Sequence, residues 1–221
     1  DLNIVKALDG EVIFVDSLRE EKNLAAMRVS YNAIVHCTDG RILVEVGGQQ
    51  IKVTPGQLLL IPAGKLVQPM LISTDIEASA LLLSDRVLKS LLSNQINVWN
   101  RAMYMKEIYV VKEADWIGGL QNFAHSIFFN SENKPLLSKD IMLAFLRTML
   151  LLICDELLQH ENMNAGDDSA TDRDKVIFNQ FLELLSGESQ KRKQVSFYAE
   201  KLFITPKYLS TICRTVSGKS P

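Results

Sequence analysis

The segment from Val195 to Pro221, VSFYAEKLFITPKYLSTICRTVSGKSP, places the strongest constraint on the fold, because it carries signals for two short helices joined by a tight turn. Thr205 and Pro206 mark the start of the second helix. A threonine side chain accepts a hydrogen bond from a free backbone N–H group, and proline suits the first helical position. Gly218 supplies the end of that helix. The segment therefore predicts a helix-turn-helix.

The second of these helices has an apolar face and a polar face. Leu209 and Ile212 lie three residues apart with Cys213 beside them, so we expect them to pack on the first helix at the small residue Ala199. The opposite face carries a stripe of basic and hydroxyl side chains, Lys207, Ser210, Thr211 and Arg214. Such a stripe either reads base edges in the major groove of DNA or is an ordinary solvated face of a helical hairpin.

The basic charge of the chain gathers in the same region. From Arg173 onward the sequence holds nine Lys or Arg against four Asp or Glu, a net charge of +5, whereas the whole chain carries −2. A run of three cations, Lys191 to Lys193, precedes the first helix and either meets the DNA backbone or lies in a solvated loop. Because Lys and Arg release counter-ions from phosphates, double-stranded DNA is the expected partner.

The sequence AEKLFITPKYLS (199–210), followed by SGKSP (217–221), resembles the first helix-turn-helix of AraC-type transcriptional regulators. The resemblance implies that the polar stripe is the reading face of the recognition helix, with Tyr208 flanking the DNA backbone. The DNA-binding residues expected in this way are Thr205, Lys207, Tyr208, Ser210, Thr211 and Arg214.

Members of that family carry a second helix-turn-helix after a long linking helix, whereas this sequence stops at Pro221. The resemblance therefore implies that the chain holds about half of a DNA-binding domain. We expect Pro221 to mark a truncation or a proteolytic cut rather than a natural terminus.

Composition is typical of a globular protein from a reducing compartment. With 221 residues and 47% hydrophobic composition, the chain can form one large or two small domains. Cys37, Cys154 and Cys213 are widely spaced and form no CxxC pair, which argues against a disulfide framework or a zinc cluster. The N-terminus lacks the features of a signal peptide, and no apolar run is long and uncharged enough to span a membrane. We therefore expect a cytoplasmic protein.

Residues 31 to 83 follow the pattern of short antiparallel strands. The runs ILVEV and QQIKV alternate between apolar and polar residues, and a further strand is expected over 76–83. Asp39-Gly40 and Gly47-Gly48 are dipeptides typical of hairpin turns. Consecutive strands of this kind predict a small antiparallel barrel or sandwich.

Gly56, followed after five residues by Pro62-x-Gly64, resembles the second half of the cupin signature. A cupin-like barrel precedes the DNA-binding module in sugar-responsive AraC regulators. In metal-binding cupins a histidine follows Pro-x-Gly by three residues, but Val67 occupies that position here. No ligand spacing relates the three histidines His36, His125 and His160. The resemblance therefore implies a barrel that needs no metal or other cofactor.

An effector site is expected near the mouth of the barrel. Arg28, Tyr31 and His36 are the candidate contacts, with Trp99 as a further candidate. His36 lies in a predicted strand, so that it is either an effector contact or an ordinary strand residue. The resemblance implies a sugar or related metabolite as effector, and residues 1–15 as a mobile arm over the pocket.

Helices are predicted after the strands. Ser84 is placed to cap DRVLKSLL, and a second helix is predicted over 115–129. Ser138 begins the apolar segment KDIMLAFLRTMLLLICDELLQH, whose apolar residues cover more than one helical stripe. A helix of this kind is buried on several sides. The explanation is either a homodimer through 138–160, which the resemblance also implies, or a monomer in which this helix is central.

Together these patterns predict an α+β chain whose cupin-type antiparallel β-barrel and C-terminal helices precede an all-α, partial helix-turn-helix domain. The predicted sensor and dimerisation domain covers 1–160, with the barrel in about 1–83 and the helices in about 84–160. The polar segment over 161–173 predicts a linker, and 174–221 form the DNA-binding part.

The expected function is that of a transcriptional regulator and not of an enzyme. A small molecule in the barrel would shift the population of states in which the DNA-binding parts are presented. Two alternatives stay open: a cupin-fold enzyme, either an isomerase or a dioxygenase, and a DNA-binding dimer that responds to no effector.

Overall fold

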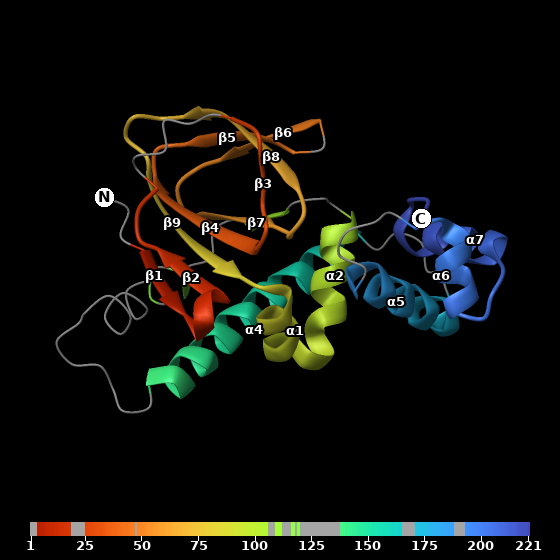
Figure 1. Ribbon diagram of the computed structural model, residues 1–221. Coiled ribbons are helices and arrows are strands. Elements are labelled where there is room, and N and C mark those ends of the chain that lie inside the picture. The colour runs from red at the N-terminus through yellow and green to blue at the C-terminus, as the bar shows by residue number, and fades with distance from the viewer. Residues whose placement is uncertain are drawn as a thin grey trace. The chain divides into compact units, whose positions relative to one another are not determined.

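The structure, a computed structural model, describes residues 4–18, 25–46, 48–105, 109–111, 116, 117, 119, 138–164, 171–187 and 193–221. It has the predicted α+β composition and divides into two compact units (Figure 1). One unit comprises Asp1–Ser93 and Glu107–Glu156, and the other comprises Asn94–Lys106 and Leu157–Pro221.

The first unit is built around two antiparallel sheets. The six-stranded sheet has the order β1-β2-β9-β4-β7-β10, and the four-stranded sheet has the order β3-β8-β5-β6. A short 3-10 helix, η1 (Leu8–Gly10), joins the first two strands. The strands are β1 (Ile4–Ala7), β2 (Val12–Val15), β3 (Met27–Arg28), β4 (Asn32–Asp39), β5 (Ile42–Val46), β6 (Gln49–Val53), β7 (Gln57–Ile61), β8 (Leu66–Ile72), β9 (Glu77–Leu83) and β10 (Tyr109–Val111).

The two sheets pack face to face around one apolar core, as the predicted barrel or sandwich requires. Alternation along β5 buries Ile42, Val44 and Val46, because successive side chains of a strand point to opposite faces. The buried members of this core are all aliphatic apart from one cysteine: Ala33, Cys37, Ile42, Val44, Val46, Val53, Leu59, Ile61, Val67, Ile76 and Ala78.

One of the two predicted hairpins is confirmed and the other is wrong. β5 and β6 form a hairpin in which Val46 lies opposite Gln49. In contrast, β4 pairs with β7 and β9, whereas β5 belongs to the other sheet, so Asp39-Gly40 turns the chain from one sheet to the other. Gly40 is required there, because its φ is 74° and an added Cβ would lie 2.5 Å from Ser73 Oγ.

Residues 4–15 do not form part of the mobile arm that the resemblance implies for residues 1–15, of which residues 1–3 lie outside the described residues. Residues 4–7 and 12–15 are strands of the six-stranded sheet, and Val12 lies opposite Leu83 of β9. Val12, Phe14 and Val15 are buried, so that releasing this segment would expose apolar surface to water.

Two described helices belong wholly or largely to the first unit. Ser84 caps α1 (Asp85–Leu92) as predicted, since its Oγ accepts a hydrogen bond from the N–H of Val87 at 3.2 Å. The short η2 (Ser93–Gln95) follows it. The long α4 (Ser138–Asn164) contributes residues up to Glu156. Most of the helix predicted over 115–129 lies outside the described residues.

The long helix α4 buries one apolar stripe and leaves other apolar side chains only half-buried. The buried stripe is Met142, Phe145, Leu146, Leu150, Ile153, Cys154 and Leu157. Leu143, Met149, Leu151 and Leu158 are half-buried. The homodimer through 138–160 remains a prediction.

Among the described residues, α4 and the other helices are too short or too polar to cross a membrane.

The second unit contains only helices among its described residues. Besides the last turns of α4, it comprises α2 (Ile96–Met105), α5 (Asp172–Gly187), α6 (Val195–Lys201) and α7 (Pro206–Ser217). The predicted linker overlaps two of these elements, because α4 extends to Asn164 and α5 starts at Asp172.

Candidate nucleic-acid interface

The helix-turn-helix predicted from the sequence is present as α6 and α7. The Oγ of Thr205 accepts a hydrogen bond from the N–H of Tyr208 at 3.2 Å, and Pro206 occupies the first turn of α7. Gly218 ends the helix with a left-handed φ of 71° and donates its N–H to Arg214 O at 2.9 Å. Local signals in the sequence therefore fix both ends of α7.

The apolar face of α7 packs as predicted. Leu209, Ile212 and Cys213 are buried in one core with Ala199 of α6, which has no exposed surface. Helix α5 contributes Phe178 and Phe181 to the same core. Leucines of α5 next to these two rings also pack there, some buried and some half-buried. The partly buried Ile204 also packs on it, at the turn between α6 and α7.

The opposite face of α7 presents the predicted stripe to solvent. Lys207, Thr211 and Arg214 are exposed, and Ser210 is half-buried. The hydroxyl of Ser210 donates to Pro206 O at 2.9 Å, and the hydroxyl of Thr211 donates to Lys207 O at 3.1 Å. In this arrangement the two hydroxyl oxygens can accept hydrogen bonds, while Lys207 and Arg214 supply the outward donors.

Tyr208 lies at the edge of this stripe and is tethered to α5. Its side chain is 37% exposed, and its O–H donates to Asp174 Oδ1 at 3.1 Å. The carboxylate of Asp174 raises the pKa of the Tyr208 phenol through this hydrogen bond. Thr171, Tyr208 and Arg173 together lower the pKa of Asp174, the hydrogen bond from Thr171 having the largest effect.

Two lysines flank the aromatic ring of Phe197 on α6. The Nζ atoms of Lys193 and Lys201 lie 5.1 Å and 4.5 Å from the ring centroid. Lys191 and Arg192, the other cations of the predicted run, lie outside the described residues. Contact of the run with a DNA backbone therefore remains a prediction.

Helix α2 belongs to the core of this unit, which the sequence analysis did not anticipate. Tyr104 packs edge-on against Phe178 and Phe181, with ring centroids 5.5 Å and 6.1 Å apart. Trp99, Ala102 and Met103 of the same helix are buried. The apolar periodicity of INVWNRAMYM predicts a helix. No local signal in it indicates that the helix packs on α5, which begins only at Asp172.

The three predicted effector residues lie in the first unit, and the structure does not gather them in one pocket. Arg28 donates to Gly64 O at 2.6 Å from Nη1, and the O–H of Tyr31 donates to Gly10 O at 3.0 Å. His36 occupies β4 between Val35 and Cys37, which pack in the barrel core, so strand alternation places it on the opposite face.

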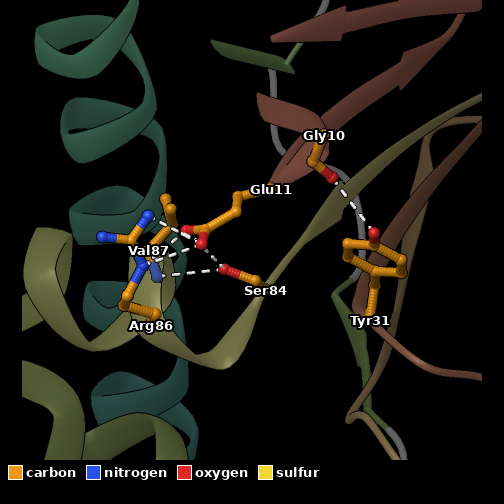
Figure 2. A network of polar contacts seen from close by, with 6 residues as sticks. All are labelled: Gly10, Glu11, Tyr31, Ser84, Arg86 and Val87. Carbon is orange, nitrogen blue, oxygen red and sulfur yellow. Dashed lines mark hydrogen bonds and ion pairs between the residues drawn. The ribbon is translucent and has the colours of Figure 1, made fainter. Parts of the chain in front are cut away.

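Tyr31 instead borders a polar network that fixes the start of β2 (Figure 2). Figure 2 shows Arg86 and Ser84 pointing at the carboxylate of Glu11, while Tyr31 reaches the backbone of Gly10. Arg86 Nε lies 2.8 Å from both oxygens of Glu11, and the resulting ion pair lowers the pKa of Glu11. The network joins α1 to the N-terminal hairpin.

The barrel core contains no cluster of polar side chains among the residues that the structure describes. Its core side chains are aliphatic apart from Cys37, and no group of three or more His, Cys, Asp or Glu in the described ranges could hold a metal ion. A hollow of about 760 Å³ lies on β5, β6 and β8 and is lined in part by Arg41, Lys52 and Leu71.

Comparison with known proteins gives similarities in structure alone. No protein-family model and no curated protein sequence matches the chain. Apo ToxT from Vibrio cholerae is similar over 96% of this chain and 95% of that protein, with 12% identity and a TM-score of 0.42. The AraC-like transcriptional activator CuxR is similar over 98% of this chain and 75% of that protein, with 14% identity and a TM-score of 0.48.

A further similarity covers only part of the chain. An ethanolamine utilization protein EutQ from Salmonella typhimurium is similar over 36% of this chain and 63% of that protein, with 15% identity and a TM-score of 0.30. The similarities to ToxT and CuxR extend over most of the chain, whereas the similarity to EutQ covers about a third of it.

Proposed function

We propose that this protein is a DNA-binding transcriptional regulator in which α7 reads base edges in the major groove. One observation carries the proposal: the capped helix α7 buries its apolar face on α5 and α6 and exposes Lys207, Thr211 and Arg214 on the other side. A helix fits the major groove, and side chains spaced in this way reach successive base pairs.

The chemistry of the exposed face suits DNA. The guanidinium of Arg214 can donate two parallel hydrogen bonds to guanine, and Lys207 can donate to the same edge or to a phosphate. Thr211 and Ser210 accept hydrogen bonds or place methyl and methylene groups against thymine. Thr205 uses its Oγ as the helix cap, so its role in DNA binding is to fix the start of α7.

Selection from a random duplex library tests this function. The chain should enrich a common sequence, and Arg214→Ala should then weaken binding by about 1–3 kcal/mol with relaxed preference at one position. Arg147→Ala is the matched control, because it removes an exposed helical arginine from α4 of the first unit. Enrichment of no sequence, or equal losses for the two variants, would contradict the proposal.

A small-molecule effector is the second part of the proposal. Since the described barrel core is aliphatic, a sugar would find few hydrogen-bond partners there. The hollow on β5, β6 and β8 combines two cations, Arg41 and Lys52, and one carboxylate, Asp75, with apolar Leu43 and Leu71. Because cations outnumber anions in this lining, it suits a ligand with an acid group and an apolar body.

Thermal unfolding with a panel of sugars and of aliphatic and aromatic carboxylic acids tests this part. A ligand at 100 times its dissociation constant stabilises a protein by about 2.7 kcal/mol. Lys52→Ala should reduce the shift caused by an acid, while Lys6→Ala, which removes an exposed lysine from β1, should not. Failure of the whole panel would favour a regulator that responds to no effector.

A further inference from the structure

The start of α5 and the start of α7 are joined through a single carboxylate. Thr171 and Asp174 form a reciprocal capping box: Asp174 N–H donates to Thr171 Oγ at 3.2 Å, and Thr171 N–H donates to Asp174 Oδ2 at 3.2 Å. The hydroxyl of Thr171 also donates to Oδ2 at 2.7 Å. The other oxygen, Oδ1, accepts the hydrogen bond from the phenol of Tyr208.

Tyr208 is therefore held at two points. Its N–H is bound by the capping oxygen of Thr205 in its own helix, and its O–H is bound by Asp174 of α5. A half-exposed tyrosine without such a partner samples several rotamers, and ordering it on binding costs free energy. The hydrogen bond to a carboxylate is a strong one and fixes the ring beside the exposed stripe.

We propose that Asp174 is a positioning residue for DNA binding, which holds the ring of Tyr208 at the edge of the reading face of α7. The inference rests on the DNA-binding function proposed above. Because the phenol proton is committed to Asp174, Tyr208 contributes the fixed surface of its ring against the sugar-phosphate backbone rather than a hydrogen bond to phosphate.

The sign of the expected effect separates this role from two simpler ones. Asp174 is an anion near a surface that meets phosphates, so removal of its charge alone would tighten DNA binding. If Asp174 acted only as a helix cap, its removal would weaken binding to the same extent with or without the phenol of Tyr208. A positioning role predicts weaker binding, and the loss disappears once the phenol has been removed.

A double-mutant cycle on the 221-residue chain tests the proposal, with a duplex enriched by the parent protein from a random library as the probe. Asp174→Ala and Tyr208→Phe should each lower affinity about three- to tenfold, and the double variant should bind no more weakly than either single variant. Ser84→Ala removes the cap of α1 in the first unit and is the control for a loss of stability elsewhere; it should leave the affinity within twofold.

A second measurement requires no DNA. In protein labelled with 13C at Cζ of tyrosine, the resonance that disappears in Tyr208→Phe identifies this residue, and its titration gives the pKa of the phenol. Asp174→Ala should lower that pKa toward the ordinary value, because the carboxylate raises it. An unchanged pKa would overturn the proposed contact.

The outcomes are distinct. Tighter binding by Asp174→Ala, or losses that multiply in the double variant, would overturn the positioning role while the proposed function stands. If the parent enriches no duplex, the proposed function falls and the positioning role in DNA binding falls with it, although the titration still reports whether the phenol and the carboxylate are joined.

Discussion

Tyr104 donates a hydrogen bond from its phenol to the backbone carbonyl oxygen of Ser220 over 3.0 Å, although the two residues are 116 positions apart. Tyr104 belongs to α2, and Ser220 lies beyond Gly218, which caps the end of α7. The contact fixes the segment that leaves the helix-turn-helix. Together with the rings of Phe178 and Phe181, it makes α2 a structural part of the candidate DNA-binding unit.

Tyr104→Ala should destabilise the second unit by about 2–4 kcal/mol, because it removes a large half-buried ring together with its aromatic contacts. Urea denaturation followed by hydrogen exchange of α5 and α7 measures the loss. Tyr104→Phe keeps the ring and loses only the hydroxyl, with its hydrogen bonds to Ser220 O and the Cys213 thiol, so it should cost about 1 kcal/mol. Unchanged exchange of α5 in Tyr104→Ala would show that α2 does not support this core.

High pH should weaken the same unit. Burial raises the pKa of Tyr104 to about 12, so that the folded state favours the protonated phenol. The contribution of this pKa shift to the free energy of unfolding is fully present below the ordinary pKa of about 10. It is lost as the pH rises from there through about 12. Unfolding free energies measured from pH 8 to pH 12 should fall less steeply in Tyr104→Phe. Cys154 and Cys213 titrate in an overlapping window, with pKa values that burial raises to about 12 and about 11, and the hydrogen bond with Tyr104 lowers the pKa of Cys213.

Phe203→Gly should stabilise the second unit by about 0.5–1 kcal/mol. Phe203 has a left-handed φ of 54° in the turn before α7, a conformation that glycine adopts without steric cost. Its side chain is 96% exposed and gives little packing in return. Phe203→Ala, which removes the ring but keeps the unfavourable φ, is the matched control. A gain of equal size in both variants would assign the effect to exposure of the ring instead of the backbone.

Met149→Lys should convert a homodimer to a monomer if the half-buried side of α4 forms the dimer contact. A charge placed in an apolar interface is costly to desolvate. Sedimentation equilibrium at micromolar concentration measures the mass, and Thr148→Lys on the exposed side of the same helix is the control. A parent protein that sediments as a monomer at these concentrations would contradict the dimer prediction.

Local signals explain what the sequence predicted well. Thr205, Pro206 and Gly218 act on backbone groups within a few residues, and therefore the ends of α7 could be predicted. The same holds for Ser84 at the start of α1. The barrel could be predicted for a similar reason, because the alternation of apolar and polar residues along a strand depends only on which face of that strand is buried.

Long-range pairing explains what the sequence did not reveal. Asp39-Gly40 has the residues of a hairpin turn, but β4 pairs with β7 and β9 of its own sheet while β5 lies in the other sheet, and no local pattern encodes that choice. The pairing of β2 with β9 and the packing of Tyr104 on α5 depend on equally distant partners. Tyr208 was expected at the interface from the resemblance, whereas its partner Asp174 lies 34 residues away and gave no local signal.

The position of α2 limits how this protein can be divided. The chain passes from one unit to the other after Ser93, after Lys106 and after Glu156. A gene fragment that begins at α5 would encode α7 without the α2 residue that packs on its core, and the remaining fragment would keep α2 without the aromatic rings of α5 that Tyr104 contacts. Exchange of the first unit between proteins built in this way would require crossovers at all three of these positions instead of a single one.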